Sequence, residues 1–330
     1  MPANVGQMFY YGETPWHREG VKVGRPLTVD EALDAGGLEW SVGTEPITTA
    51  HTNLGTDKRR ALVRWERGEP VAVVGVVHDG FRPLQNRDGA ETFDGIFGHG
   101  QPIYHTGGYL GQGEVVWLQA ALPQTIHLGD DDPVECYALY ANSHDGSRAI
   151  TMALTTVRVV CQNTLKMALH ERGTANYRFS QRHQISPGRL AEQATDYWQA
   201  MLDAIERTRH AYQKLAMVEC HRDAFAALLD HVVPPPRKPA AGASQASLTR
   251  YQRRLAEVHD VRSRIERLRE GGRGADLPSA QGTLWGALNA FTEYYDHHAE
   301  LEGSRLAYGL LGQGAALKQK AFEKTMELAK

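Results

Sequence analysis

Residues 134–160 read VECYALYANSHDGSRAITMALTTVRVV, and the expected architecture is built around this segment. Two runs rich in apolar, aromatic and β-branched residues, 134–142 and 147–160, flank Ser143-His-Asp-Gly146. An Asp-Gly pair between two such runs is a strong signal for a β-hairpin. We therefore expect two long antiparallel strands at the centre of the molecule.

The same pattern recurs on the N-terminal side. Residues 61–65 and 70–77 flank a Gly-containing loop, and residues 102–110 and 114–122 flank Gly111-Gln-Gly113. Successive hairpins with helices between them predict an α+β fold, with an antiparallel hairpin sheet backed by helices. Because residues 70–77 are almost continuously apolar, we expect that strand to be buried on both faces.

Helix signals separate the hairpins. Thr28-Val-Asp-Glu31 is a capping box, and the helix that it begins should end at Gly36-Gly37. Asn86 is expected to cap a second helix. A third helix is expected over Cys161–His170, entered through Asn163. The acidic triplet Asp130–Asp132 is expected to form a solvated turn.

The C-terminal half has a helical pattern. Pro187 suits a first helical position after Ser186, and residues 234–247 form a Pro-, Ala- and Ser-rich loop. We predict an α+β core domain over residues 1–183 and a mainly helical region over residues 184–330. Beyond the loop, a short heptad-like apolar stripe is formed by Leu248, Tyr251, Leu255 and Val258.

The net charge of −3 conceals an uneven distribution. Residues 148–182 hold six Arg and Lys against one Glu, a balance of +5, and residues 237–273 hold ten against four, a balance of +6. The other 258 residues therefore carry −3 − 5 − 6 = −14. Since local field governs polyanion binding, the small total charge does not exclude a nucleic-acid partner.

Composition limits the other classes. With 42% hydrophobic residues and no apolar run of 18, the chain is expected to be globular and not to enter a membrane. The N-terminus lacks the pattern of a signal peptide, and three scattered Cys fit a reducing interior. We therefore expect a cytoplasmic protein.

The first basic segment is the main candidate site. Arg178 and Arg182 alternate with aromatic residues, and guanidinium groups grip phosphates while aromatic rings stack on unpaired bases. The alternative is a strand with exposed Arg and buried aromatic residues. The candidate nucleic-acid-binding residues are Arg148, Arg158, Lys166, Arg172, Tyr177, Arg178, Phe179 and Arg182.

Residues 248–273 form a second basic element that would contact DNA or a protein partner, or would be only an exposed helical arm. Its candidate residues are Arg250, Arg253, Arg254, Arg262 and Arg264.

Enzyme signatures are weaker. His144 and Asp145 lie at a hairpin tip, where Asp stabilises turns. Asp296, His297 and His298 are adjacent, and neighbouring side chains on a helix point about 100° apart, which does not suit a single metal ion. With neither a metal-protease motif nor a nucleotide-binding motif in the sequence, we expect no cofactor and favour a non-enzymatic protein.

Several stretches resemble a family of phage- and plasmid-related proteins, the domain of unknown function numbered 932. These stretches are 8–12 with 15–17, Phe81–Asn86, Asn142–Ser147, Thr156–Thr164 and Thr283–His298. The resemblance implies a mobile element in a bacterial cytoplasm. A looser similarity, to phage single-strand annealing proteins of the Redβ, RecT and Erf type, implies a hairpin sheet backed by a helix and self-association on single strands.

The leading hypothesis is a single-stranded DNA-binding protein of a mobile element, acting in annealing, recombination or replication and likewise expected to self-associate. One alternative is a metal-dependent nuclease or hydrolase that uses dispersed groups such as His105, His144 and Asp296. Another is an interaction protein that acts on a host or defence system through the heptad-like helix.

Overall fold

The computed structural model of the chain describes residues 5–12, 20–52, 54–101, 103–158, 163–166, 178–181, 187–299, 308 and 312–330. At residues 158, 163–166, 178–181, 187–197 and 199 the description is confined to the backbone.

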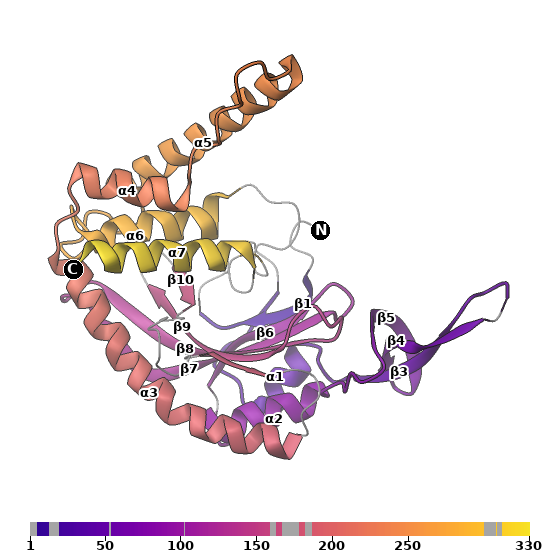
Figure 1. The fold of residues 1–330 in the computed structure, drawn as a ribbon. Helices are drawn as coiled ribbons and strands as arrows, with labels where there is room; N and C mark the ends of the chain where they lie inside the picture. Colours follow the sequence, from indigo (N-terminus) through magenta and orange to yellow (C-terminus); the bar gives the residue numbers. More distant parts are fainter. Residues whose placement is uncertain are drawn as a thin grey trace.

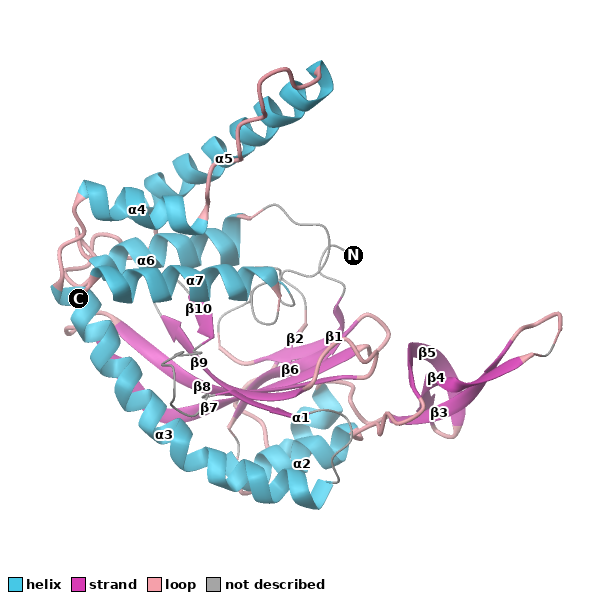
Figure 2. Ribbon diagram, in the orientation of Figure 1, coloured by secondary structure: helices cyan, strands magenta, loops and turns pink. Residues whose placement is uncertain are grey.

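The centre of the molecule is an eight-stranded, largely antiparallel sheet (Figures 1 and 2). Its strands run in the order β10-β9-β8-β7-β6-β1-β2, and β11 also pairs with β9. Among the strands of the described residues, only β1 and β2 pair in parallel. The bounds are β1 Val5–Tyr10, β2 Val21–Lys22, β6 Tyr104–Leu110, β7 Val115–His127, β8 Pro133–Ser143, β9 Ile150–Arg158, β10 Asn163–Lys166 and β11 Arg178–Gln181. The antiparallel sheet with its helices confirms the α+β prediction.

The central hairpin forms as the sequence predicts. β8 and β9 pair from Val134 opposite Arg158 to Ala141 opposite Thr151. At the turn, the Asp145 carboxylate accepts hydrogen bonds from the Ser143 hydroxyl and the Ser147 backbone amide, while Gly146 takes a positive φ of 74°. Asp145 therefore stabilises the turn, as expected.

Helix α1 (Val29–Ala35) also begins as predicted. The Thr28 hydroxyl accepts from the Glu31 amide, and the Glu31 carboxylate accepts from the Thr28 amide, which completes the capping box. The helix ends at Gly36, and Gly37 follows with a φ of +63° that favours glycine.

A separate three-stranded sheet consists of β3 (Ser41–Thr48), β4 (Gly55–Glu66) and β5 (Glu69–His78). Figure 1 shows that it projects to one side of the main sheet. The expectation that residues 70–77 are buried on both faces is wrong, because Val71, Val73 and Val76 are 54–60% exposed. Only the face with Val74 and Val77 joins the core.

The inner face of β5 touches the tip of the central hairpin. An ideal Cβ atom on Gly75 would lie 2.6 Å from the Asp145 Cα atom, so only glycine fits there without displacing backbone.

Helix α2 (Asn86–Phe97) is not capped by Asn86, contrary to prediction. Gln85 occupies the N-cap without a side-chain capping bond, and its amide group exchanges two hydrogen bonds with the backbone of Val42. Asn86 is the first helical residue and is buried. A tertiary role therefore takes precedence over capping at this position.

The helix predicted over Cys161–His170 is wrong within the described residues. Asn163–Lys166 is the strand β10, which pairs with the edge of β9. Because β9 would otherwise expose unpaired backbone groups along this edge, pairing outweighs the helical propensity of so short a segment. Cys161 and residues 167–170 lie outside the described residues.

The C-terminal half is helical: α3 (Pro187–Met217), α4 (Arg222–Val232), α5 (Gln245–Gly271), α6 (Leu284–Glu293), the π-helical turn η1 (Tyr294–His298) and α7 (Gln313–Leu328). Helix α3 begins at Pro187, as predicted. Met201, Ile205, Thr208 and Tyr212 are buried on its predicted face. The Tyr212 hydroxyl lies 2.7 Å from the Thr156 hydroxyl, which joins α3 to the sheet.

Asp132 joins the β7–β8 turn to α6, and the expectation of a solvated acidic turn is wrong for this residue. Its side chain is buried and accepts hydrogen bonds from Ser279 Oγ at 2.6 Å and Trp285 Nε1 at 3.0 Å. No helix in the described part of the chain combines the length and the hydropathy needed to cross a bilayer.

Candidate nucleic-acid interface

The first basic segment follows the outer edge of β9. Strand β10 pairs with the end of β9, where Lys166 lies opposite Thr155, and β11 pairs with its beginning, where Arg178 lies opposite Ala153. Two short strands therefore share one edge of β9, and we call the strip that they form the β9 edge. Since a strand rises about 3.3 Å per residue, Lys166 and Arg178 are brought within about 7 Å along that edge.

The other predicted residues of this segment take different places. Arg158 is the last residue of β9, whereas Arg148 is half-buried in the β8–β9 turn, at the opposite end of the strand. Phe179 lies opposite Met152 in the register of β11. Arg172, Tyr177 and Arg182 lie outside the described residues.

The structure divides the second basic element into two parts. Arg262 is tied to the body of the molecule: its guanidinium donates to the Val233 carbonyl and, at 2.7 Å, to the Asp230 carboxylate. Arg264 forms an ion pair with Asp260 at 2.9 Å. These two residues stabilise the base of α5.

Arg250, Arg253 and Arg254 lie on the outer half of α5, where all three are exposed. Figure 1 shows that this half extends well beyond α4, α6 and α7. Arg253 contacts Glu257 at 3.6 Å, while Arg250 and Arg254 form no ion pair with a described carboxylate. These guanidinium groups are accessible to a ligand.

The candidate metal ligands of the central hairpin take part in structural contacts. His144 is fully buried, with its Nε2 atom 2.8 Å from Asn86 Oδ1 and its ring packed against Trp40. Asp145 faces its own turn, as described above. Buried and committed in this way, the imidazole is not presented to a substrate.

The second candidate set lies at η1. Lys318 of α7 is fully buried and donates to Asp296 Oδ1, and burial lowers the pKa of this lysine. His297 is half-buried, and His298 is 46% exposed, with its Nε2 atom 3.9 Å from Glu293. Across the described residues, no three His, Cys, Asp or Glu side chains are arranged to hold a metal ion.

His105 belongs to a polar and aromatic group on the sheet. The Tyr137 hydroxyl donates to Glu135 and lies 3.4 Å from His105 Nδ1, and the His105 ring also meets Tyr11 edge-on. Burial lowers the pKa of His105, which favours the neutral imidazole.

Sequence reasoning did not identify the junction between the two sheets. The Arg64 guanidinium lies over the rings of Trp40 and Tyr109, 4.5 and 4.6 Å from their centroids, and donates to the Gln112 carbonyl. Asn86 and His144 lie beside Trp40. Phe81–Asn86 and Asn142–Ser147, two of the stretches that carry the family resemblance, therefore meet here and serve a structural purpose.

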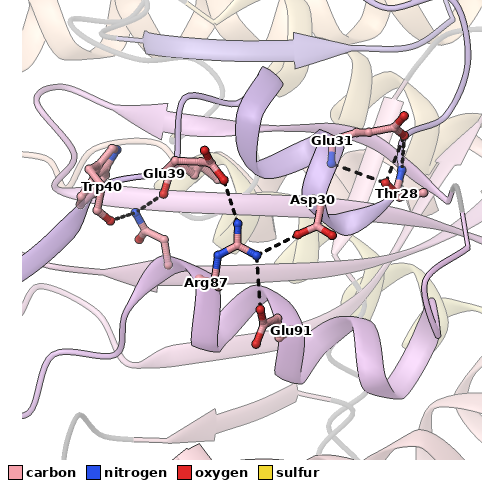
Figure 3. Close-up of polar contacts among 9 residues, drawn as sticks. Thr28, Asp30, Glu31, Glu39, Trp40, Arg87 and Glu91 are labelled. Atoms are coloured by element: carbon pink, nitrogen blue, oxygen red, sulfur yellow. Dashed lines mark hydrogen bonds and ion pairs between the residues drawn. The ribbon is translucent and has the colours of Figure 1, made fainter. Parts of the chain in front are cut away.

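A surface cluster lies beside this junction (Figure 3). Arg87 binds Asp30 at 2.8 Å, Glu39 at 2.7 Å and Glu91 at 3.3 Å, and so connects α1 to α2. An open hollow of about 620 Å³ adjoins it. Arg67 and Arg87 line this hollow together with Glu39 and Asp88. Because these charges balance, the hollow has no electrostatic preference for an anionic ligand.

Comparison with known proteins identifies the family. Residues 73–327, about three quarters of the chain, match the family model described as Domain of unknown function (DUF932), and the chain therefore belongs to that family. No curated protein and no solved structure matches the chain.

Proposed function

We propose that this protein binds single-stranded DNA along the β9 edge, as a component of a phage or plasmid that acts in strand annealing, recombination or replication. The setting is the cytoplasm of a bacterial host. Binding and strand alignment need no catalytic residue, and self-association would extend the binding edge from one copy to the next.

The main support for this proposal is that Lys166 and Arg178 come together at one sheet edge. Eleven residues separate them in sequence, yet their registers on β9 differ by only two positions. Arg158 ends β9 three positions beyond Thr155, which places it on the other face of the sheet. Two neighbouring cationic residues at a sheet edge suit an extended phosphate backbone, and neutralising each phosphate releases counterions.

The sequence around Arg178 supports a single strand as the ligand. Tyr177 and Phe179 flank this arginine in sequence, with Phe179 at the neighbouring β11 position, which belongs to the other face of the sheet. Bases that are free of a duplex can stack on aromatic rings. Stacking contributes about 1–3 kcal/mol per base and requires little sequence preference.

Fluorescence anisotropy with a labelled 25-mer tests the proposal. We expect micromolar or tighter binding at 50 mM salt that weakens steeply as salt rises, and weaker competition by unlabelled duplex than by single strand. The variant Lys166→Glu/Arg178→Glu should lose at least ten-fold in affinity. Lys22→Glu/Lys58→Glu, which changes the charge equally at exposed sites on β2 and on β4 of the separate sheet, is the matched control.

Two results would overturn the proposal. One is the absence of single-strand binding by the wild-type protein at 50 mM salt. The other is an equal loss of affinity in the β9-edge variant and the control, which would indicate dependence on total charge alone.

A further inference from the structure

The outer half of α5 is an exposed helical arm. Over residues 245–260 no residue is fully buried, and Ile265 is the only buried residue of the whole helix. At 1.5 Å per residue, this outer half is about 24 Å long. A helix of that length is marginally stable alone in water, so its extension beyond the body indicates a use outside the fold.

The arm has two distinct faces. Arg250, Arg253 and Arg254 are spaced by three and four and therefore share one face. Leu248, Leu255 and Arg262 are spaced by seven and share another, about 200° from Arg250 in the case of Leu248. We call the first of these the arginine face.

The contacts of Arg262 orient both faces. Its guanidinium reaches the Val233 carbonyl and the Asp230 carboxylate, so the heptad side of α5 faces the end of α4. Around the helix, Arg262 lies about 120° from Arg250, about 180° from Arg253 and about 80° from Arg254, so the arginine face is turned away from the contact with α4.

Charge on the arm is in surplus. Residues 245–260 hold Arg250, Arg253 and Arg254 against Glu257 and Asp260, a balance of 3 − 2 = +1, and Arg237 and Lys238 of the preceding loop raise it to +3. Both acids already contact arginines, at 3.6 and 2.9 Å. An anionic partner would neutralise the remaining positive charge of this face.

We infer that the arginine face binds the phosphate backbone of double-stranded DNA. Guanidinium groups take phosphate oxygens in a forked geometry, and all three cations of this face are Arg. A straight helix fits the major groove, which is about 12 Å wide. The inference extends the proposed function, since a protein that aligns strands on the β9 edge would hold the duplex product on a second element.

The test compares a blunt 25-bp duplex with a 25-nucleotide single strand, using the full chain and anisotropy at 50, 100 and 200 mM salt. We expect Arg250→Glu/Arg253→Glu/Arg254→Glu to weaken duplex binding at least ten-fold and to reduce the slope of log K against log salt by about 3. Single-strand affinity should stay within two-fold of wild type.

Two further variants address fold and total charge. Replacing the three arginines by Gln keeps good helix formers and should give an intermediate loss. Lys22→Glu/Lys214→Glu/Lys330→Glu removes the same charge elsewhere and should retain duplex binding.

Failure of this inference differs from failure of the proposed function. Duplex affinity that is unchanged in the arm variant, or single-strand affinity that falls equally, would overturn the arm assignment. A wild-type protein that binds single strands but no duplex would also overturn it and leave the β9 edge as the DNA site. A wild-type protein that binds duplex but no single strand would overturn the proposed function.

Discussion

The Nε2 atom of His144 lies 2.8 Å from the Oδ1 atom of Asn86, although the two residues are 58 positions apart in the sequence. The Nδ2 atom of Asn86 donates to the Leu38 carbonyl at 3.0 Å, and the Trp40 carbonyl lies 3.4 Å from it. This amide orientation makes Oδ1 the acceptor, so His144 carries its proton on Nε2. One buried side chain thus connects α2, the β8–β9 hairpin and the segment that leads into β3.

Removing that connection should destabilise the fold. Asn86→Ala leaves the Leu38 carbonyl and the His144 Nε2–H without these partners, and unsatisfied buried groups cost about 1–3 kcal/mol each. We expect a loss of about 2–4 kcal/mol in urea unfolding. The exposed substitution Gln252→Ala should stay within about 0.5 kcal/mol of wild type, and a similarly small effect of Asn86→Ala would contradict this account.

Asp132 should hold the helical half against the sheet. Asp132→Ala removes the acceptor for Trp285 Nε1 and Ser279 Oγ, and we expect a cost of about 2–4 kcal/mol. Hydrogen exchange should show faster opening of α6 than in wild type. Its exposed neighbour provides the control, because Asp131→Ala should change neither the stability nor the exchange rate of α6. Equal effects at the two positions would refute the role of Asp132 in holding α6 against the sheet.

Removing one member of the Lys318–Asp296 pair should destabilise the fold strongly, whereas replacing both members by apolar residues should destabilise it little. Asp296→Ala removes the carboxylate that Lys318 contacts from beside a buried ammonium, for which about 3–5 kcal/mol is typical. Lys318→Met with Asp296→Leu removes both charges and should recover most of that loss. Thermal unfolding of the two variants provides the comparison, and a double variant less stable than Asp296→Ala would contradict the prediction.

The two faces of β5 should respond differently to substitution. Val73→Thr on the exposed face should stay within about 0.5 kcal/mol of wild type, whereas Val74→Ala on the buried face should cost about 1–3 kcal/mol. Denaturant unfolding distinguishes them. Equal costs would indicate that the exposed face is covered, for instance by a second copy in solution.

The capping box should respond to acid. Arg25 and the Thr28 amide lower the pKa of Glu31 to about 2, from 4.5. A lowered carboxyl pKa gives stability that is complete above about 4.5 and is lost as the pH falls toward 2. Glu31→Gln retains a capping side chain but loses the charge. Its small Tm deficit at pH 7 should therefore disappear by pH 2, and a deficit that is independent of pH would exclude the charge as its cause.

Local signals in the sequence predicted the features that local physics controls. The Asp-Gly turn at 145–146, the Thr28 capping box and the helix start at Pro187 each depend on neighbours within a few residues, and the structure confirms all three. Strand pairs joined by short turns were predictable for the same reason.

The wrong predictions concern residues whose environment comes from distant parts of the chain. Asn is a residue type that is favoured at helix N-caps, but the partners of Asn86 lie 46–58 positions away in the sequence. The burial of β5 depends on which elements cover it, and Asp132 meets α6 only in the folded molecule. Likewise, the adjacency of Lys166 and Arg178 follows from sheet register, which sequence spacing does not encode.

The contact between Gly75 and Asp145 has a consequence for how this protein can vary. Any side chain at position 75 would occupy the space of the backbone of the β8–β9 turn, so β5 cannot slide by one residue against the hairpin tip. Changes in chain length should therefore accumulate at the far tip of the small sheet, around residues 49–54, while the distance from Gly75 to the Arg67-Gly68 turn is inherited unchanged. In a set of natural variants, the number of residues between this turn and Gly75 should be constant, while the length of the far tip varies.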